Sequence, residues 1–150
     1  MEKLVFDSGI RVYRVNDNGV LRFNPSDPNV YARFFDAAEE IQAVEADLVE
    51  KGKTIDPEHD TGETAIRLLK EADKTVKKIL SNVFGEDNDF DQILGGVNLL
   101  AVASNGERVI TNFLNALLPV IQDGAERCAN EHIGAAVQQA KLNRAQRRAK

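Results

Sequence analysis

The sequence predicts an α+β domain, in which a small N-terminal antiparallel β-meander packs on a mainly helical bundle of about four helices. Three observations lead to this prediction. Strand-favouring residues and turn signals are confined to about residues 3–23, a heptad-spaced helix follows directly, and helical periodicity accounts for most of the remaining chain. With 150 residues, 43% of them hydrophobic, the chain suits one domain with one core. We place that domain at residues 1–140 and a basic C-terminal tail at residues 141–150.

Three short runs of apolar and β-branched residues make up the expected meander: Leu4-Val5-Phe6, Ile10–Val15 and Val20–Phe23. Asp7-Ser8-Gly9 separates the first two runs, and Asn16-Asp17-Asn18-Gly19 separates the last two. Asn and Gly tolerate the positive φ angles that tight hairpin turns require. A sheet of two or three strands is too small to be stable alone, so we expect a helix to cover it.

The first helix is expected from Asp27-Pro28 to about Lys51. Asp27 is a suitable N-cap, Pro28 suits the first helical position, and Gly52 supplies the stop. Apolar residues recur at alternating spacings of four and three, which places them on one helix face. This stripe consists of Val30, Phe34, Ala37, Ile41, Val44 and Leu48.

The stripe has two interpretations. It is either the core of an intramolecular bundle or a surface that also faces a second copy or a client helix. Tyr31 and Phe35 widen it beyond a strict coiled-coil seam, which suits a helix with more than one neighbour. On the second interpretation, the candidate partner-binding side chains of this helix are Tyr31, Phe34, Phe35 and Ile41.

Four further segments are expected to be helical. A lysine-rich helix is predicted near Thr61–Asn82, and the acidic first helix should lie beside it. A short helix is predicted at Asp89–Leu94, and a helix is favoured over a strand for Val97–Ala103. The last helix should begin near Glu107, continue to about Gln139, and be the most buried, because more than half of its first part is apolar.

The C-terminal segment is basic although the chain has a net charge of -5. The last ten residues contain no acid, and the basic residues include Arg144, Arg147 and Arg148. These arginines either complement the helix dipole as a solvated end or dock on an acidic partner. Nucleic acid is not expected as a partner, because the segment has no aromatic residue for base stacking.

No set of titratable residues suggests catalysis or a metal centre. Cys128 and His132 share a helix face, but a tetrahedral metal site needs two more strong ligands. Glu58-His59-Asp60, with Glu63, is explained by a polar loop that leads into a helix. Gly95-Gly96 is too short a signal for a phosphate loop. We therefore expect a non-enzymatic protein with no catalytic, metal or cofactor-binding residues.

A single cysteine fits a reducing compartment. The first ten residues carry neither a long apolar core nor a small-residue cleavage site, so no signal peptide is predicted. The longest apolar runs are far shorter than a membrane span. These features predict a soluble protein of the cytoplasm.

Several stretches resemble phage proteins. The stretch LRFNPSDPNVYARF (Leu21–Phe34) resembles the start of small proteins encoded in the tail-morphogenesis regions of phages and prophages of Gram-positive bacteria. Leu94–Asn98 and Asn112–Ile121 are similar to their C-terminal half. Asn143–Ala149 resembles the endings of phage tail assembly chaperones.

The resemblance implies a non-enzymatic, acidic, mainly helical protein that forms homo-oligomers in the bacterial host cytoplasm. Such chaperones are thought to coat the long helical tape measure protein before tail-tube subunits polymerise around it. The implied partner is therefore a helical tail component. The alternative is a phage-encoded inhibitor or adaptor that binds a host protein.

Overall fold

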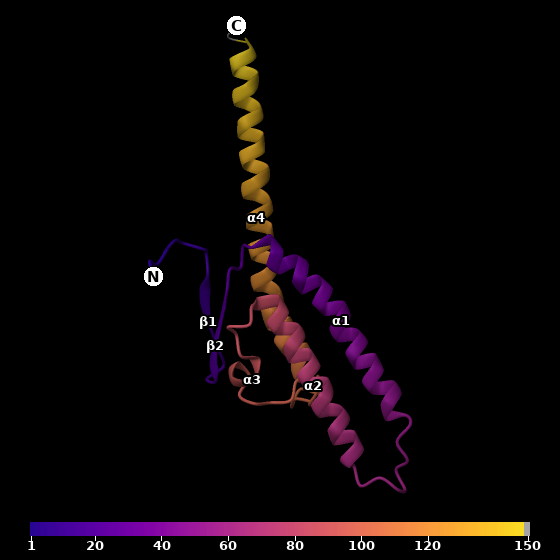
Figure 1. Cartoon of the computed structure of the whole chain (residues 1–150). Helices are drawn as coiled ribbons and strands as arrows, with labels where there is room; N and C mark the ends of the chain where they lie inside the picture. Colours follow the sequence, from indigo (N-terminus) through magenta and orange to yellow (C-terminus); the bar gives the residue numbers. More distant parts are fainter. Residues whose placement is uncertain (149–150) are drawn as a thin grey trace.

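The protein is an α+β fold, described by a computed structural model over residues 1–148, apart from the side chains of residues 132–138. A two-stranded antiparallel sheet precedes four helices (Figure 1). In chain order the elements are β1 (Arg11–Val15), β2 (Gly19–Phe23), α1 (Pro28–Gly52), α2 (Glu63–Phe84), α3 (Phe90–Ile93) and α4 (Val109–Arg148).

The expected turn at Asn16–Gly19 closes the hairpin of β1 and β2. Val15 pairs with Gly19, Asn18 N donates to the Val15 carbonyl at 3.2 Å, and Asn16 takes a positive φ of 48°. On the inner face the rings of Tyr13 and Phe23 stack with centroids 5.2 Å apart. The sheet therefore turns its aromatic side to the core.

Of the two or three strands expected, the sheet has two, because Leu4, Val5 and Phe6 form no strand and are 92%, 81% and 80% exposed. The chain turns away before it can pair with β1. Gly9 N donates to Asp7 Oδ1 at 2.8 Å, and Asn24 Nδ2 donates to the Ser8 carbonyl at 3.0 Å. We call residues 1–9 the N-terminal arm. Figure 1 shows the arm leading away from the helices.

Helices α1 and α2 form an antiparallel pair, as Figure 1 shows. Asp27 caps α1 by accepting from Asn29 N at 2.9 Å. Of the apolar stripe, Val30, Phe34, Ala37 and Ile41 are buried, and Val44 and Leu48 pack against the same core. The intramolecular interpretation of the stripe therefore accounts for its burial. Arg33 Nε also donates to the Val83 carbonyl at 3.0 Å, which joins α1 to α2.

Asn88 joins the sheet to the end of α2. Its side chain is only 4% exposed and makes three hydrogen bonds. Asn88 Oδ1 accepts from Arg22 N, while Nδ2 donates to the carbonyls of Arg22 and Phe84, each at 2.9 Å. One amide thus replaces a neighbouring strand on the outer edge of β2.

The predicted helix at Val97–Ala103 is also wrong, because this segment is irregular. Its residues Leu99 and Leu100 are buried, and hydrogen bonds to α2 hold the segment in place. Leu99 N donates to Asp73 Oδ1 at 2.8 Å, and Asn98 Nδ2 donates to the Leu69 carbonyl at 3.1 Å. These bonds satisfy the backbone without helical pairing.

A half-buried ion cluster attaches α3 to α2. Lys77 Nζ lies 2.8 Å from Asp73 Oδ2 and 2.7 Å from Asp91 Oδ1, and the Lys77 side chain is 12% exposed. Burial alone would lower the pKa of Lys77, but the hydrogen bonds to Asp73 and Asp91 outweigh it and raise that pKa. The bond from Lys77 in turn lowers the pKa of Asp91.

Replacing Lys77 with methionine is expected to destabilise the fold by about 1–2 kcal/mol, because Asp73 is left half-buried beside a neutral side chain. Urea unfolding measures this, and the exposed Lys78→Met change is the matched control, expected within about 0.5 kcal/mol of the unchanged protein. Equal effects of the two changes would rule out a special role for the cluster.

The same cluster gives the stability a pH dependence. The Asp91 pKa is lower in the fold than its ordinary 3.8, so its contribution is present above that pH and is lost as the pH falls through the folded value. The Lys77 pKa is raised above 10.5, so its contribution is present below 10.5 and is lost as the pH rises through the folded value. The deficit of Lys77→Met should therefore be constant between about pH 5 and 9.

Helix α4 differs from its prediction in length and burial. It runs unbroken through Pro119 to Arg148, so residues 141–148 of the predicted tail are helical. Among its described side chains, the buried apolar residues are Ile110, Leu117 and Ile121, and α2 has more of them. The described part of α4 is thus less buried than expected for the last helix. The physical reason is visible in Figure 1, where α4 extends far beyond the elements that cover its first half.

Candidate functional site

The structure divides the predicted partner-binding residues into two groups. Tyr31, Phe34 and Ile41 belong to the core of the chain itself, so their side chains are not on the exposed surface. Phe35 is 63% exposed on the outer side of α1. The exposed residues near the end of α4 include Arg144, Arg147 and Arg148. Among the described residues, no hydrogen bond or ion pair links Arg144, Arg147 or Arg148 to Phe35 or Tyr31.

Tyr31 is buried because it belongs to a crossing point between two parts of the chain. Its hydroxyl donates to the Pro25 carbonyl, and the segment that holds Pro25 passes directly over α4 at Gly124. A Cβ on Gly124 would overlap with the Pro25 carbonyl oxygen and crowd the Tyr31 hydroxyl. Burial raises the pKa of Tyr31, followed by a smaller contribution from Cys128.

Sequence reasoning missed Gly124, although a signal was present. A glycine in the interior of a helix costs about 1 kcal/mol relative to alanine, so it needs a reason in packing or function. The reason is the close approach of Pro25. Beyond this crossing point, α4 leaves the body of the protein.

We call Ala125–Arg148 the projecting helix. Figure 1 shows it extending alone from the body to the C-terminus. Among its described side chains, Ala125 and Cys128 are half-buried near the crossing, and residues 139–148 are exposed. Its last turns carry cations without an acid, since they include Lys141, Arg144, Arg147 and Arg148. The projecting helix is thus a long rod with an exposed, basic end.

A second surface is an apolar groove of 490 Å³ between the hairpin and the first half of α4. We call it the groove. Tyr13 and Arg14, which lie on opposite faces of β1, both line the groove. From β2, only inward-facing side chains line it. Strand β1 therefore forms the rim of the groove. Its apolar wall includes Tyr13, Val15, Phe113, Ala116, Leu117 and Val120.

The groove is short. Along α4 its lining ends at Val120, and the Pro25 segment crosses the helix at Gly124, just beyond that end. From Val109 to Val120, α4 rises by about 17 Å. A long client helix is therefore better matched by the projecting helix, while a short apolar segment is better matched by the groove.

Next to the groove, the outer edge of β1 is open. Because the backbone N–H and carbonyl of Arg22 bond to Asn88, its pairing with Val12 is of the type without cross-strand hydrogen bonds. The backbone N–H and carbonyl of Val12 consequently point away from β2. In the described part of the chain, no residue bonds to them. Val12 is also 54% exposed.

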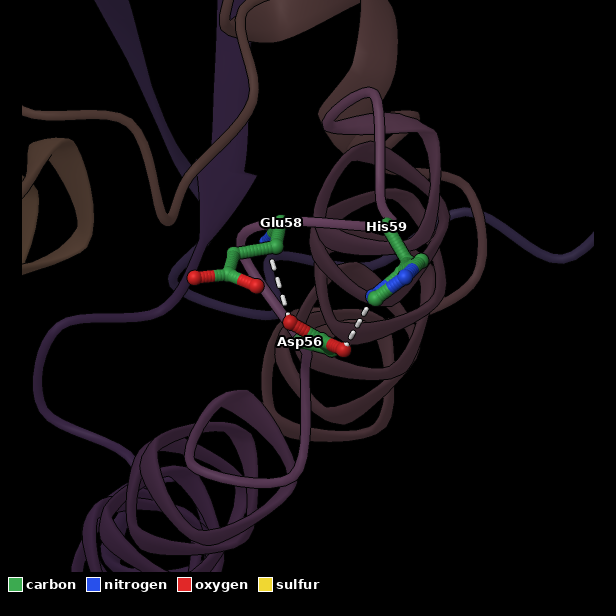
Figure 2. Close-up of side chains that lie close together, drawn as sticks. All are labelled: Asp56, Glu58 and His59. Atoms are coloured by element: carbon green, nitrogen blue, oxygen red, sulfur yellow. Dashed lines mark hydrogen bonds and ion pairs between the residues drawn. The ribbon is translucent and has the colours of Figure 1, made fainter.

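One cluster of potential metal ligands occurs among the described side chains. Figure 2 shows Asp56 between Glu58 and His59, with His59 Nδ1 at 2.6 Å from Asp56 Oδ2 and Glu58 N donating to Asp56 Oδ1 at 2.9 Å. These bonds lower the pKa of Asp56, the backbone bond most strongly. All three residues are exposed, and their bonds close a loop, so the cluster is explained as a turn.

The other members of the predicted loop set serve the start of α2. Asp60 Oδ1 accepts from Gly62 N at 2.8 Å, and Glu63 pairs with Arg67 at 2.5 Å. Cys128 is a free, half-buried thiol. The side chain of His132, its potential companion, lies outside the described residues.

In the part of the chain that the structure describes, no helix is both long and apolar enough to cross a bilayer. Comparison of the chain with protein-family models, with curated proteins and with solved structures found no match.

Proposed function

We propose that this protein is a non-enzymatic phage tail assembly chaperone that binds the helical tape measure protein in the cytoplasm of the bacterial host. The observation that carries the proposal is the projecting helix, a rod of about 36 Å whose described side chains contact the body only near its base, at Ala125 and Cys128. The resemblance of the sequence to tail assembly chaperones supplies the identity of the client.

The mechanism is helix-to-helix shielding. A long amphipathic client helix lies with its apolar face against the projecting helix. The apolar face of the client is thereby shielded from water, which suppresses self-association of the client. The basic residues at the end of α4, among them Arg144, Arg147 and Arg148, attract acidic residues of the client and fix its direction. The body of the protein, formed by α1, α2 and the sheet, holds the base of this rod rigid through the crossing at Gly124.

Coexpression with a helical fragment of the tape measure protein from the same phage genome tests the proposal. The full chain should keep the fragment soluble. Reversing three charges, with Arg144→Glu, Arg147→Glu and Arg148→Glu, should reduce the soluble fraction several-fold while leaving the circular dichroism of the chaperone nearly unchanged, because exposed charges contribute little to stability.

Helix α2 offers a matched control. Lys70, Lys74 and Lys78 are also exposed and share one face of a helix, so their triple reversal to Glu changes the net charge equally. This control should rescue the fragment like the unchanged protein. A loss of rescue in Phe35→Lys but not in the arginine variant would move the client surface to α1.

A wild-type chain that leaves the fragment insoluble would overturn the chaperone proposal. The alternative, an inhibitor or adaptor that binds a host protein, would then take its place.

A further inference from the structure

Among the side chains that the structure describes, the most exposed large apolar ones belong to the N-terminal arm. Leu4, Val5 and Phe6 lie next to one another in a segment that is strand-favouring in sequence yet unpaired in the fold. Three neighbouring large apolar residues in water mark a contact site rather than a solvated end. The arm is therefore a strand-favouring segment that pairs with no strand among the described residues of its own chain.

The open edge of β1 and the groove beside it form a site for an additional strand, and no described segment of the chain occupies this site. A two-stranded sheet is marginal alone, and an edge with free backbone groups is a template for a further strand. A third strand beside β1 would pair with the outward N–H and carbonyl of Val12. It would also extend over the groove, because β1 forms the groove's rim.

We propose that the arm of a second copy of this chain adds as a third strand to the open edge of β1 and covers the groove, so that two copies exchange arms. Side chains of a strand alternate between faces, which places Leu4 and Phe6 on one face and Val5 on the other. An antiparallel alignment of Phe6 with Tyr13 and of Leu4 with Val15 turns both apolar side chains into the groove.

Charge favours this occupant. In this alignment Asp7 lies opposite Val12 and diagonal to Arg14 on the same face, whereas Glu2 and Lys3 lie beyond the end of β1. Opposite charges on adjacent strands stabilise their pairing. The exchange is reciprocal, since each copy supplies one arm and one edge, and it therefore closes as a symmetric dimer.

The root of the arm explains why the partner is a second copy. Asn24 donates a hydrogen bond to the Ser8 carbonyl, and Asp7 accepts one from Gly9 N. These two bonds direct the arm away from its own β1. Folding back onto that edge would break the bond between Asn24 and Ser8. The six residues beyond this root, fully extended, reach about 20 Å, enough to contact a neighbouring molecule.

Light scattering coupled to gel filtration, without any client, tests the exchange. The full chain should show about twice its mass of 16.6 kDa. Deletion of residues 2–6 should give a monomer. Val12→Pro should also give a monomer, because proline removes the outward N–H that the incoming strand needs and leaves the bonds between β1 and β2 intact. Val12→Ala, the matched control, should remain dimeric.

A mixing experiment gives the sharpest result. The arm-deleted chain keeps an acceptor edge, and the Val12→Pro chain keeps a donor arm, so an equimolar mixture should regain the dimer mass although each variant alone is monomeric. Circular dichroism confirms that both variants fold.

Three results would each overturn the exchange. The first is a monomeric wild-type chain at about 200 µM, a concentration well above the micromolar affinity of an ordinary small interface. The second is a dimer that persists in both variants. The third is a monomer in which the amides of residues 4–6 resist hydrogen exchange, because it would show that the arm pairs with its own β1.

Discussion

Replacing Gly124 with alanine is expected to lower the free energy of unfolding by about 2 kcal/mol, even though alanine is the better helix former. The added Cβ would overlap with the Pro25 carbonyl oxygen, which is backbone and cannot rotate away. Overpacking of this kind costs about 1–3 kcal/mol or more, which exceeds the roughly 1 kcal/mol that alanine gains over glycine in a helix. Urea unfolding followed by circular dichroism measures the change.

Gly52 provides the matched control for Gly124. It lies at the end of α1, and nothing would touch an added Cβ there, so Gly52→Ala should leave stability unchanged or raise it slightly. A second readout is the ionisation of the tyrosines followed by ultraviolet absorbance. Because burial raises the pKa of Tyr31, separation of the crossing segments in Gly124→Ala should bring that pKa back toward 10.0. Unchanged stability in both glycine variants would mean that Pro25 does not press on α4.

Replacing Asn88 with alanine should cost about 3 kcal/mol. The change removes three hydrogen bonds and leaves the backbone groups of Arg22 and Phe84 without partners in a region where Asn88 itself is nearly inaccessible. An unsatisfied buried polar group costs about 1–3 kcal/mol, and the hairpin loses its attachment to α2 as well. Thermal and urea unfolding both report the loss.

An exposed asparagine controls for the chemistry of the Asn88 substitution. Asn130→Ala, on the projecting helix, should change stability by less than about 0.5 kcal/mol. Asn88→Asp should fall between the two, because the carboxylate still accepts from Arg22 N but no longer donates to the two carbonyls. If Asn88→Ala matched Asn130→Ala, the hairpin would be held by its apolar face alone.

Local signals were sufficient for the elements whose stability is local. Asp27, Pro28 and the apolar stripe predicted α1 almost to the residue, and the cluster of asparagine and glycine after Val15 predicted the turn of the hairpin. These features act within a few residues of chain, through caps, helix periodicity and turn geometry.

The errors arose where distant residues decide the structure. Leu4–Phe6 reads as a strand, but its pairing is prevented by Asn24, which holds the root of the arm. Val97–Ala103 reads as a helix, but Asp73 of α2 binds its backbone in an irregular form. Asn88 lies in an acidic loop of ordinary composition, and its role depends on a strand 66 residues away. No local pattern predicts such contacts.

The candidate sites show the same limit. From the sequence, the basic residues of the C-terminal end were either a solvated helix end or a docking segment, and the structure adds that they stand on a helix that leaves the body. It also removes Tyr31, Phe34 and Ile41 from the exposed set, because these side chains belong to the core of a helix that packs against α2 and α4. The amphipathic pattern of a helix does not say whether its partner is within the chain or outside it.

Hydrogen exchange of the full chain, with and without the tape measure fragment, is the most direct test of the proposal that the projecting helix binds a helical client. A lone helix opens easily, because most helical stability in proteins comes from packing. The account predicts that the amides of residues 125–148 exchange quickly in the free protein and slow down at least tenfold when the fragment is present, while those of α2 are unchanged. Unchanged exchange in residues 125–148, with a fragment that is demonstrably bound, would contradict it.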